Sequence, residues 1–278
     1  MPPQDLQSSL LASLSSQSLP LPSQSWLTTL LSSRGNPPPP LPSLTATVRA
    51  RLLASDLTTP SLLDATYISS HSLPPAITRP DVRSTTLNRD VVLQVLDIEN
   101  LSQSRWSQVE ELEALARGEG TKGREVVRLP VGGEEEEGER GVTQATQTQA
   151  QTQTQGRTAG RGAAAVAATV APSSGTHKLV LQDCSGLKVS GLELKRVPKI
   201  AIGTLNIGEK ILVKSGASVS RGVIMLEPTT CVVLGGRVEV WHKAWVDGRL
   251  ARLKEAATTA AAAPAAAERQ GPARRQGQ

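Results

Sequence analysis

Residues 207–240 read IGEKILVKSGASVSRGVIMLEPTTCVVLGGRVEV. β-Branched and aliphatic residues dominate three short runs in this stretch, at Ile211–Lys214, Val223–Glu227 and Cys231–Leu234. Such runs predict β-strands, and the glycines between them predict tight turns. Short strands at this spacing are typical of a small closed or partly open barrel. We therefore expect a small β-barrel in this half of the chain.

Three earlier runs complete the predicted barrel. Val91–Ile98 indicates its first strand, and the runs HKLVLQD and LKVSGLELK, which begin at His177 and Leu187, indicate the next two. Residues 117–176 separate the first strand from the others and contain a run of four glutamates and a Gln/Thr repeat, which are low-complexity sequence. Loop-closure entropy grows only logarithmically with length. We therefore interpret 117–176 as a disordered insertion within one barrel domain, 86–255.

Residues 1–85 predict a small helical domain. Leucines that share one face of a first helix are Leu6, Leu10, Leu11 and Leu14. Ser23 is placed to cap a second helix, and Ser43 to cap a third that ends near Leu57. The four prolines at 37–40 form a stiff spacer between them. Such a bundle is marginal alone, so we expect it to dock against the barrel in an α+β fold.

Two further helical segments are predicted around the barrel. The segment from Ser102 through Leu115 reads as a capped amphipathic helix, and we expect Trp106 within it to pack onto the barrel. Val238–Lys254 returns to the spacing of a helix. The remainder, 256–278, is rich in Ala and Arg and is predicted to be a disordered tail.

Composition favours a soluble intracellular protein. Two cysteines, Cys184 and Cys231, are too few for a disulfide framework or a metal site. No apolar run approaches the roughly 20 residues of a membrane span, and the N-terminus matches neither a secretory signal nor a transit peptide. Net charge is +5, and residues 177–255 carry 13 basic and 7 acidic side chains. That surplus permits contact with nucleic acid or with an acidic partner.

The sequence gives little support to an enzyme. His71, His177 and His242 are scattered and show no metal-ligand spacing with the cysteines. Asp97 and Glu99 lie two residues apart at a strand end and form the best candidate acid/base pair. Carboxylates at strand ends are far more often solvated or capping groups. No Gly-rich phosphate-binding loop is present. We therefore expect no catalytic residue, no metal and no cofactor.

Binding of single-stranded nucleic acid is the alternative function. The basic residues that we expect on one face of the barrel are Lys195, Arg196, Lys199, Lys210, Lys214 and Arg221. Strand-binding barrels stack bases on aromatic side chains, each stacked base contributing about 1–3 kcal/mol, and the predicted strands contain none. Trp241 and Trp245 lie beyond the last strand, four residues apart, which favours helix packing. Direct binding would then be weak and salt-sensitive.

Two parts of the chain resemble the RecQ-mediated genome instability protein 1 family. The first part, residues 43–116, contains SDL at 55–57 and LQVLDIENLSQSRWSQVEELE at 93–113. The second part, residues 177–245, contains KLVLQDCSGLKVSGLEL, VPKI and the series GEKILVK, RGVIMLEP and VVLGGRVE, which is the most specific match. The resemblance implies a small N-terminal helical domain followed by an OB-fold barrel.

The resemblance also implies a function. Members of this family are nuclear, non-catalytic subunits that bind a type IA topoisomerase (topoisomerase III) and a RecQ-type helicase, and the complex decatenates DNA and dissolves double Holliday junctions. A loop inserted after the first barrel strand reaches towards the topoisomerase gate in the family, and residues 117–176 match its position. Candidate partner-binding residues are Lys122, Arg124, Arg128 and Pro130 in the insertion, with Lys210, Lys214 and Arg221 on the barrel.

Overall fold

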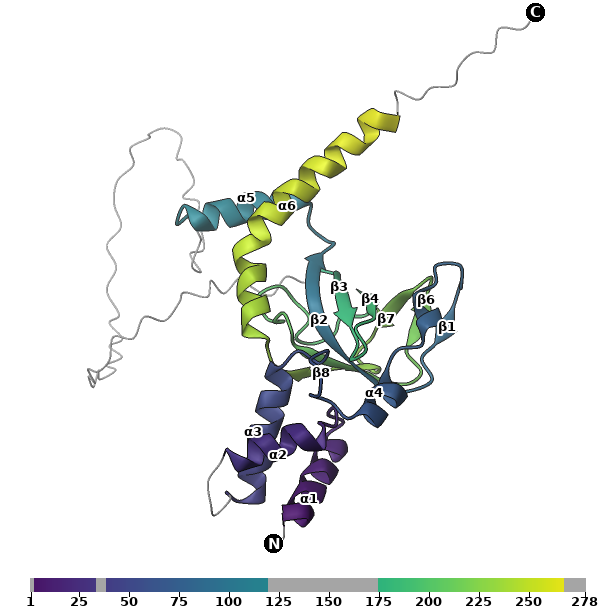
Figure 1. Cartoon of the computed structure of the whole chain (residues 1–278). Coiled ribbons are helices and arrows are strands. Elements are labelled where there is room, and N and C mark those ends of the chain that lie inside the picture. Colours follow the sequence, from purple (N-terminus) through teal and green to yellow (C-terminus); the bar gives the residue numbers. More distant parts are fainter. Residues whose placement is uncertain (1–2, 34–38, 120–174, 268–278) are drawn as a thin grey trace, which may run out of the picture.

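A computed structural model of the chain describes residues 3–33, 39–119 and 175–267. Four helices form the N-terminal part (Figure 1): α1 Pro3–Ser16, α2 Gln24–Ser32, α3 Leu41–Ala54 and α4 Ala65–His71. A 3-10 turn at Pro75–Thr78 then leads into the sheet. The predicted helical domain is therefore present.

The residues just before α2 and α3 determine where these two helices begin. Ser23 caps α2 as predicted, because its Oγ accepts a hydrogen bond from the backbone N of Trp26 at 3.3 Å. The predicted cap of the third helix at Ser43 is wrong. α3 already begins at Leu41, directly after Pro40, since proline in the first turn fixes φ near the helical value and lacks an N–H that would stay unpaired.

All strands of the chain's described part join one curled sheet. They are β1 Thr85–Thr86, β2 Val91–Asn100, β3 His177–Gln182, β4 Lys188–Glu193, β5 Lys210–Val213, β6 Ser218–Ser220, β7 Val223–Leu226 and β8 Cys231–Gly235. Their order across the sheet is β1-β6-β7-β4-β3-β2-β5-β8. Neighbours are antiparallel except for the parallel pair of β4 and β7. The three strands predicted within 207–240 are confirmed to within one residue at each end.

The sheet closes on itself because two of its outlying strands are consecutive in the chain. β5 and β6 lie near opposite sides of the sheet order, yet only residues 214–217 separate them. β5 with β6, and β7 with β8, are thus two bent strands of one hairpin that pairs with β2 on one side and β4 on the other. Five strands in this arrangement make the partly open barrel of an OB-fold. The predicted α+β fold is confirmed.

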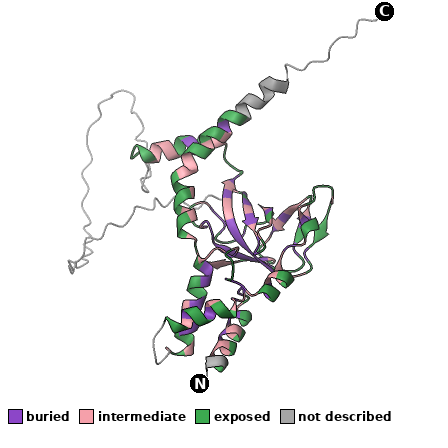
Figure 2. Ribbon diagram, viewed as in Figure 1, coloured by how far each residue is buried: buried purple, intermediate pink, exposed green. Residues whose placement is uncertain are grey.

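The barrel core is built from alternate residues of the strands. Val91, Leu93 and Val95 of β2 are fully buried in it, as is Leu179 of β3. β2 is buried on its other face as well, since Val92 is only 4% exposed. Figure 2 shows buried and intermediate residues along β2. β2 therefore lies between the barrel interior and a second layer.

That second layer is the helical domain. Leu52, Leu57 and Tyr67 form an apolar cluster with Val92 of β2 and Leu212 of β5. These two strand residues face away from the barrel interior, so without the helices they would be exposed to water. The predicted docking of the helices against the barrel is confirmed, and burial of this apolar area stabilises the two parts as one unit.

Polar contacts complete the junction between the helices and the barrel. Gln94 Nε2 donates to Asp56 Oδ1 at 2.7 Å, and the backbone N of Leu57 donates to Gln94 Oε1 at 3.0 Å. Lys210 Nζ donates to the carbonyl oxygen of Ser55 at 2.6 Å. The SDL motif therefore supplies the polar side of this junction. α3 ends before it, earlier than predicted, because these residues turn towards the barrel.

Two helices pack together on the insertion side of the barrel (Figure 1): α5 Arg105–Ala116 and α6 Glu239–Ala267. Ser104, rather than the predicted Ser102, caps α5. α6 runs past residue 255, where the predicted tail begins, because alanine, the strongest helix former, fills this part of the sequence. Among the described helices, none has the length and hydropathy to cross a membrane.

Candidate interaction surface at the root of the insertion

Between β2 and α5, which leads to the insertion, the chain makes a turn that its own side chains hold. We call residues 100–108 and 175–177 the root of the insertion. Asn100 Oδ1 accepts a hydrogen bond from the backbone N of Ser102 at 2.9 Å, which is an Asx turn. Buried Gln108 donates from Nε2 to the carbonyl oxygen of Asn100 at 3.1 Å. These bonds end β2 and fix the direction in which α5 starts.

The chain returns to the barrel directly beside this turn. The backbone N of Leu101 donates to the carbonyl oxygen of Thr176 at 2.9 Å, and the backbone N of Thr176 donates to Ser102 Oγ at 2.8 Å. A Cβ added to Gly175 would lie 2.6 Å from Asn100 Oδ1, so a larger residue does not fit without a shift. Exit and return are therefore held as one rigid unit.

A buried carboxylate organises the return side of the root. Glu193, 5% exposed at the end of β4, accepts from the backbone N of His177 at 3.2 Å and from its Nδ1 at 2.9 Å. Its other oxygen accepts from the backbone N of Val197 at 2.8 Å. Arg196 Nη1 donates to the carbonyl oxygen of Gly175 at 3.1 Å. Glu193 thus joins the start of β3 to the loop after β4.

α6 braces the outgoing side of the root. Trp245, which packs against the barrel core, donates from Nε1 to Asp97 Oδ1 of β2 at 2.6 Å. Lys254 Nζ forms an ion pair with Glu113 Oε1 of α5 at 2.6 Å. The guanidinium of Arg249 lies over the Trp245 ring at 5.5 Å, and burial lowers the pKa of this arginine. α5 is therefore held to the barrel through α6.

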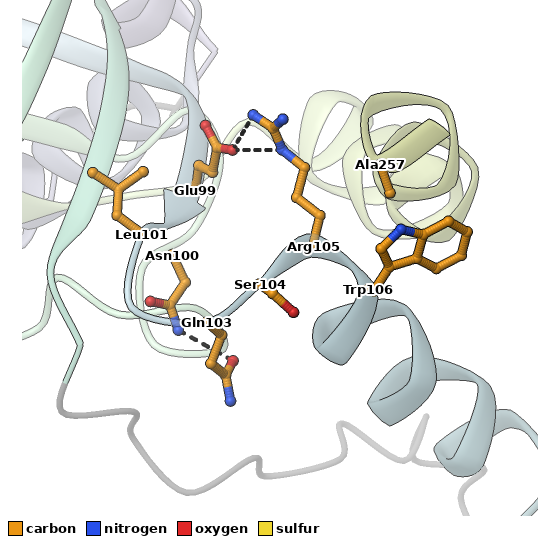
Figure 3. A pocket seen from close by; sticks show the side chains of 8 residues that line it. All are labelled: Glu99, Asn100, Leu101, Gln103, Ser104, Arg105, Trp106 and Ala257. Carbon is orange, nitrogen blue, oxygen red and sulfur yellow. Dashed lines mark hydrogen bonds and ion pairs between the residues drawn. The ribbon is translucent and has the colours of Figure 1, made fainter. Parts of the chain in front are cut away.

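A hollow of about 490 Å³ lies between the root and α6 (Figure 3). Its lining residues are Glu99, Asn100, Leu101, Gln103, Ser104, Arg105, Trp106 and Ala257. Arg105 donates from Nη2 to Glu99 Oε1 at 2.8 Å along one wall. Trp106 stands beside Ala257 and is 49% exposed. The prediction that Trp106 packs onto the barrel is therefore wrong, since its ring lies beside α6 instead.

The structure separates the candidate partner-binding residues. Lys214 and Arg221 are exposed, but they lie near the starts of β2 and β4, at the end of the barrel opposite the root. For Lys214, the ten residues of β2 make that separation about 30 Å. Lys122, Arg124, Arg128 and Pro130 fall outside the described residues.

Lys210 does not lie on an exposed basic face, so the prediction that placed it on such a face is wrong. Its side chain is 0% exposed beneath the helical domain, with Nζ donating to the carbonyl oxygens of Ser55 and Gly208. The burial was not visible in the sequence, because a lysine next to a buried strand run resembles a strand-end surface residue. Glu193 was missed for the same reason: it ends a strand of alternating burial and falls on the inward face.

The two carboxylates considered for acid/base chemistry have structural partners. Asp97 accepts from Trp245, and Glu99 forms its ion pair with Arg105. Across the residues with described placement, no three His, Cys, Asp or Glu side chains are arranged to hold a metal ion. Both carboxylates are therefore bonded to side chains of the neighbouring helices, Asp97 to α6 and Glu99 to α5.

The ligand face of an OB-fold is centred on its second and third strands, which are β3 and β4 here. Their outward residues include Lys178, Val180, Lys188 and Leu192, and no aromatic residue. All five aromatic residues of the chain lie in helices: Trp26, Tyr67, Trp106, Trp241 and Trp245. Trp241 and Trp245 pack against the barrel core, as predicted. The face lacks the stacking platforms of a strand-binding barrel.

Fold and root together define an OB-fold protein with an N-terminal helical domain and a long insertion between its first two barrel strands. A family model described as "RMI1, N-terminal OB-fold domain" matches residues 73–249, and one described as "RMI1, N-terminal helical domain" matches residues 14–60. The chain belongs to the RMI1 family.

A curated relative supports this assignment. The chain is 30% identical over 167 residues to the RecQ-mediated genome instability protein 1 of Schizosaccharomyces pombe. The match covers 59% of this chain and 63% of that protein, so it spans less than two thirds of the relative's length.

Proposed function

We propose that this chain is a nuclear, non-catalytic subunit of a complex between a RecQ-type helicase and a type IA topoisomerase (topoisomerase III). In that complex it would support genome stability by stimulating decatenation and the dissolution of double Holliday junctions. Membership in the RMI1 family and the name of the yeast relative, which refers to RecQ, support a role of this kind.

The observation that carries the proposal is the absence of aromatic residues from every barrel strand. An OB-fold that binds single strands presents stacking platforms on its strands, and this barrel presents aliphatic and charged side chains instead. Contacts with protein surfaces need no such platforms. A protein partner therefore fits the ligand face better than a nucleic acid does.

The rigid root supports a role for the insertion in that contact. Hydrogen bonds from Leu101, Ser102 and Glu193 hold the return end of the insertion at residues 176–177, and α5 leads to its outgoing end from the same end of the barrel. A segment anchored in this way acts on a partner's gate if it contacts the open state more favourably than the closed state. The expected result is a topoisomerase whose gate stays open longer.

Co-purification of the full chain with its cognate topoisomerase III, at moderate salt, tests the proposal. Oligonucleotide binding by the isolated chain is measured alongside, over a range of salt concentrations. We expect a stoichiometric complex and weak DNA binding. Tight oligonucleotide binding without a topoisomerase complex would instead favour the alternative, a single-stranded nucleic-acid-binding protein.

A further inference from the structure

A two-stranded ribbon at one edge of the sheet brings arginines together. β1 is the edge strand of the sheet order and pairs with β6. The backbone N of Arg221, which follows β6 directly, donates to the carbonyl oxygen of Val82 at 3.1 Å. Ser220 Oγ donates to the carbonyl oxygen of Arg83 at 3.0 Å. Arg83 and Arg221 are therefore neighbours at the same end of the ribbon.

The turn after β6 places Arg221 at the tip of a hairpin. Ser220 pairs with Val223 of β7, so Arg221 and Gly222 form a two-residue turn. Both have a positive φ, 48° at Arg221 and 80° at Gly222, as a type I′ turn requires. Asn, Asp and Gly are the usual residues in such a turn, and arginine rarely adopts this conformation. Backbone strain of this kind clusters at functional positions, and here it holds an exposed arginine at the tip.

Arg79 lies beside the same turn. A Cβ added to Gly222 would be 2.7 Å from the carbonyl oxygen of Thr78, the residue before Arg79. The backbone next to Arg79 therefore contacts the turn closely, and Arg79 itself is exposed. Three arginines from two separate stretches of the chain thus gather at one tip.

A lysine of the neighbouring strand extends this basic group. Ser190 of β4 pairs in parallel with Val223 of β7. Lys188 and Arg221 each precede these partners by two residues, so they lie at the same end of the strand pair. Lys188 is exposed as well. We call these four residues the ribbon cluster: Arg79, Arg83, Lys188 and Arg221.

The ribbon cluster presents a net positive charge. Within the described part of the chain, its four members form no ion pair. Asp81 lies between Arg79 and Arg83 in the sequence, is exposed and pairs with neither of them. Four basic groups and this one carboxylate leave a net charge of +3.

The carboxylates of the adjoining segments do not cancel that charge. Asp183 is fully buried and accepts hydrogen bonds from three backbone N–H groups. Asp90 accepts from the backbone N of Ser215 at 2.8 Å, beyond the other end of the ribbon. Glu227, past the end of β7, is paired with Lys195. These charges are therefore buried, paired or placed away from the tip.

Hydroxyl groups occupy the rest of the exposed surface of the ribbon. Val219, the apolar residue of β6, is buried, and no large apolar side chain of the ribbon is exposed. Four hydroxyl side chains are exposed here and form no hydrogen bond with other described residues: Ser84, Thr85, Thr86 and Ser218.

This composition distinguishes between two kinds of partner. A protein interface is centred on buried aromatic or aliphatic anchors, and the ribbon offers none. Arginine, lysine, serine and threonine side chains are the groups that contact the phosphates of nucleic acids. Single strands need aromatic platforms as well, whereas a duplex keeps its bases stacked inside and presents its phosphates outwards. The ribbon cluster therefore matches the backbone of a duplex.

We propose that the ribbon cluster binds the phosphate backbone of double-stranded DNA without reading its sequence. The inference goes beyond the proposed function, because it gives the subunit a duplex contact of its own, on the side of the barrel opposite α6 (Figure 1). It rests on the proposed function only in taking the duplex to be DNA rather than RNA. Binding through so few charges is weak at moderate salt, as the proposed function expects.

Fluorescence anisotropy of a short labelled DNA duplex of mixed sequence, titrated with the full chain at several salt concentrations, tests the inference. The variant carries Arg83→Gln and Arg221→Gln together, which removes two of the four charges. We expect its affinity for the duplex to fall about tenfold at low salt. The slope of log K against log salt concentration should become shallower by about 2, since each lost phosphate contact removes about 1 from it.

The matched control removes the same charge from another part of the surface. Arg51→Gln with Lys243→Gln neutralises two exposed side chains, on α3 and α6, which lie away from the ribbon (Figure 1). This control should bind the duplex within about twofold of the unaltered chain and keep its salt dependence.

A third variant tests the opposite direction. Asp81→Asn removes the carboxylate that lies among the arginines, so the repulsion between this carboxylate and the phosphates is lost. We expect the affinity for the duplex to rise about twofold to threefold at low salt and the gain to disappear at high salt.

Several results would overturn the inference. Unchanged duplex binding in the Arg83 and Arg221 variant, or an equal loss in the control, would place the binding elsewhere on the chain. Tighter binding of a single strand than of the duplex would contradict the choice of ligand. A polyglutamate peptide that competes as well as unlabelled duplex would assign the ribbon cluster to an acidic protein.

The proposed function fails separately from this inference. If the Arg83 and Arg221 variant loses duplex binding but no topoisomerase complex is obtained, the ribbon cluster is confirmed and the proposed function is wrong. If the complex forms and the variant binds the duplex like the unaltered chain, the proposed function stands and the ribbon cluster is wrong.

Discussion

The pKa of Lys210 depends strongly on the buried surroundings of its side chain. Its ammonium group lies under the helical domain, bonded to the carbonyl oxygens of Ser55 and Gly208, each at 2.6 Å. Burial lowers the pKa of Lys210 to about 8, and the carboxylates of Asp56 and Glu209 raise it in part. The ammonium group of Lys210 bonds the barrel to the helical domain, but keeping it charged in this buried place costs free energy of folding at neutral pH.

The sign of this effect gives a pH-dependence. Because the pKa of Lys210 is lower in the folded chain, the unfolded chain binds the proton more tightly. The contribution of Lys210 to the free energy of unfolding is therefore lowest below pH 8 and rises between pH 8 and pH 10.5. The whole change is about 3 kcal/mol, from about 1.4 kcal/mol per pKa unit.

Lys210→Met should remove this rise. Urea unfolding at several pH values between 8 and 10.5 would show a flatter dependence for Lys210→Met than for the unaltered chain. Buried Tyr67 and Cys231 titrate at high pH in both proteins, so the difference between the two curves isolates the lysine. Lys214→Met, at an exposed position four residues on, is the control and should leave the curve unchanged. Parallel curves for all three proteins would contradict the assignment.

Glu193 makes the second prediction at this scale. One of its oxygens accepts two hydrogen bonds from His177, and the other accepts one from Val197. Glu193→Gln replaces one acceptor by an amide donor, which then faces a backbone N–H. We expect a loss of about 1–3 kcal/mol in the free energy of unfolding, the cost of leaving a buried polar group unpaired. Urea denaturation measures this loss.

Glu227→Gln is the matched control for Glu193→Gln. Glu227 has a partly exposed side chain, paired with the exposed Lys195. Loss of this ion pair in Glu227→Gln should change the free energy of unfolding by less than about 1 kcal/mol. Hydrogen exchange at residues 176–178 gives a second readout and should increase only in Glu193→Gln. Equal effects of both substitutions would show that Glu193 does not organise the root.

At the scale of elements, α6 links α5 to the barrel through Trp245 and Lys254. Trp245→Phe keeps an aromatic ring in the core but removes the 2.6 Å hydrogen bond to Asp97. Because the acceptor is a carboxylate, we expect the free energy of unfolding to fall by about 1.5–3 kcal/mol. Thermal unfolding measures this change. Val246→Ala, at the next and exposed position, should change stability by no more than about 0.5 kcal/mol. A stable Trp245→Phe protein would mean that ring packing alone holds α6.

Elements with a strong local pattern were predictable from the sequence. The strands within 207–240 and the helix capped by Ser23 depend on alternation, turn glycines and a serine cap, all of which act over a few residues. Helix ends were less predictable. Proline rather than Ser43 starts α3, and contacts with the barrel, which the local sequence does not reveal, end it early.

At the scale of the whole molecule, the root should make the barrel insensitive to the length of the insertion. We expect a chain in which about 15 Gly and Ser residues replace the 55 residues 120–174 to fold with a stability within about 1 kcal/mol of the unaltered chain. In the proposed function, this chain should fail to stimulate decatenation by topoisomerase III. Stimulation at the full level would remove the insertion from the mechanism, and an unfolded protein would contradict the role of the root.

The assembly of the whole molecule was the least predictable level. A helical domain and a barrel were expected, and the loop-like position of the insertion followed from the order of the strands. The contacts that hold them join residues far apart in sequence: Gln94 with Asp56, Lys210 with Ser55, and Glu193 with His177. No local period or motif encodes such pairs, so the burial of Lys210 and Glu193 emerged only from the fold.

The junction made by Gln94, Asp56 and Lys210 has a consequence for how this chain can change over generations. A substitution of Asp56 removes one acceptor of the buried Gln94 amide and a carboxylate that raises the pKa of buried Lys210, a loss that selection acts against. We therefore expect correlated substitutions at these positions among relatives. The positions belong to two regions that match separate family models, at 14–60 and 73–249. A helical domain taken from a distant relative should therefore pack correctly only against the barrel of that same relative.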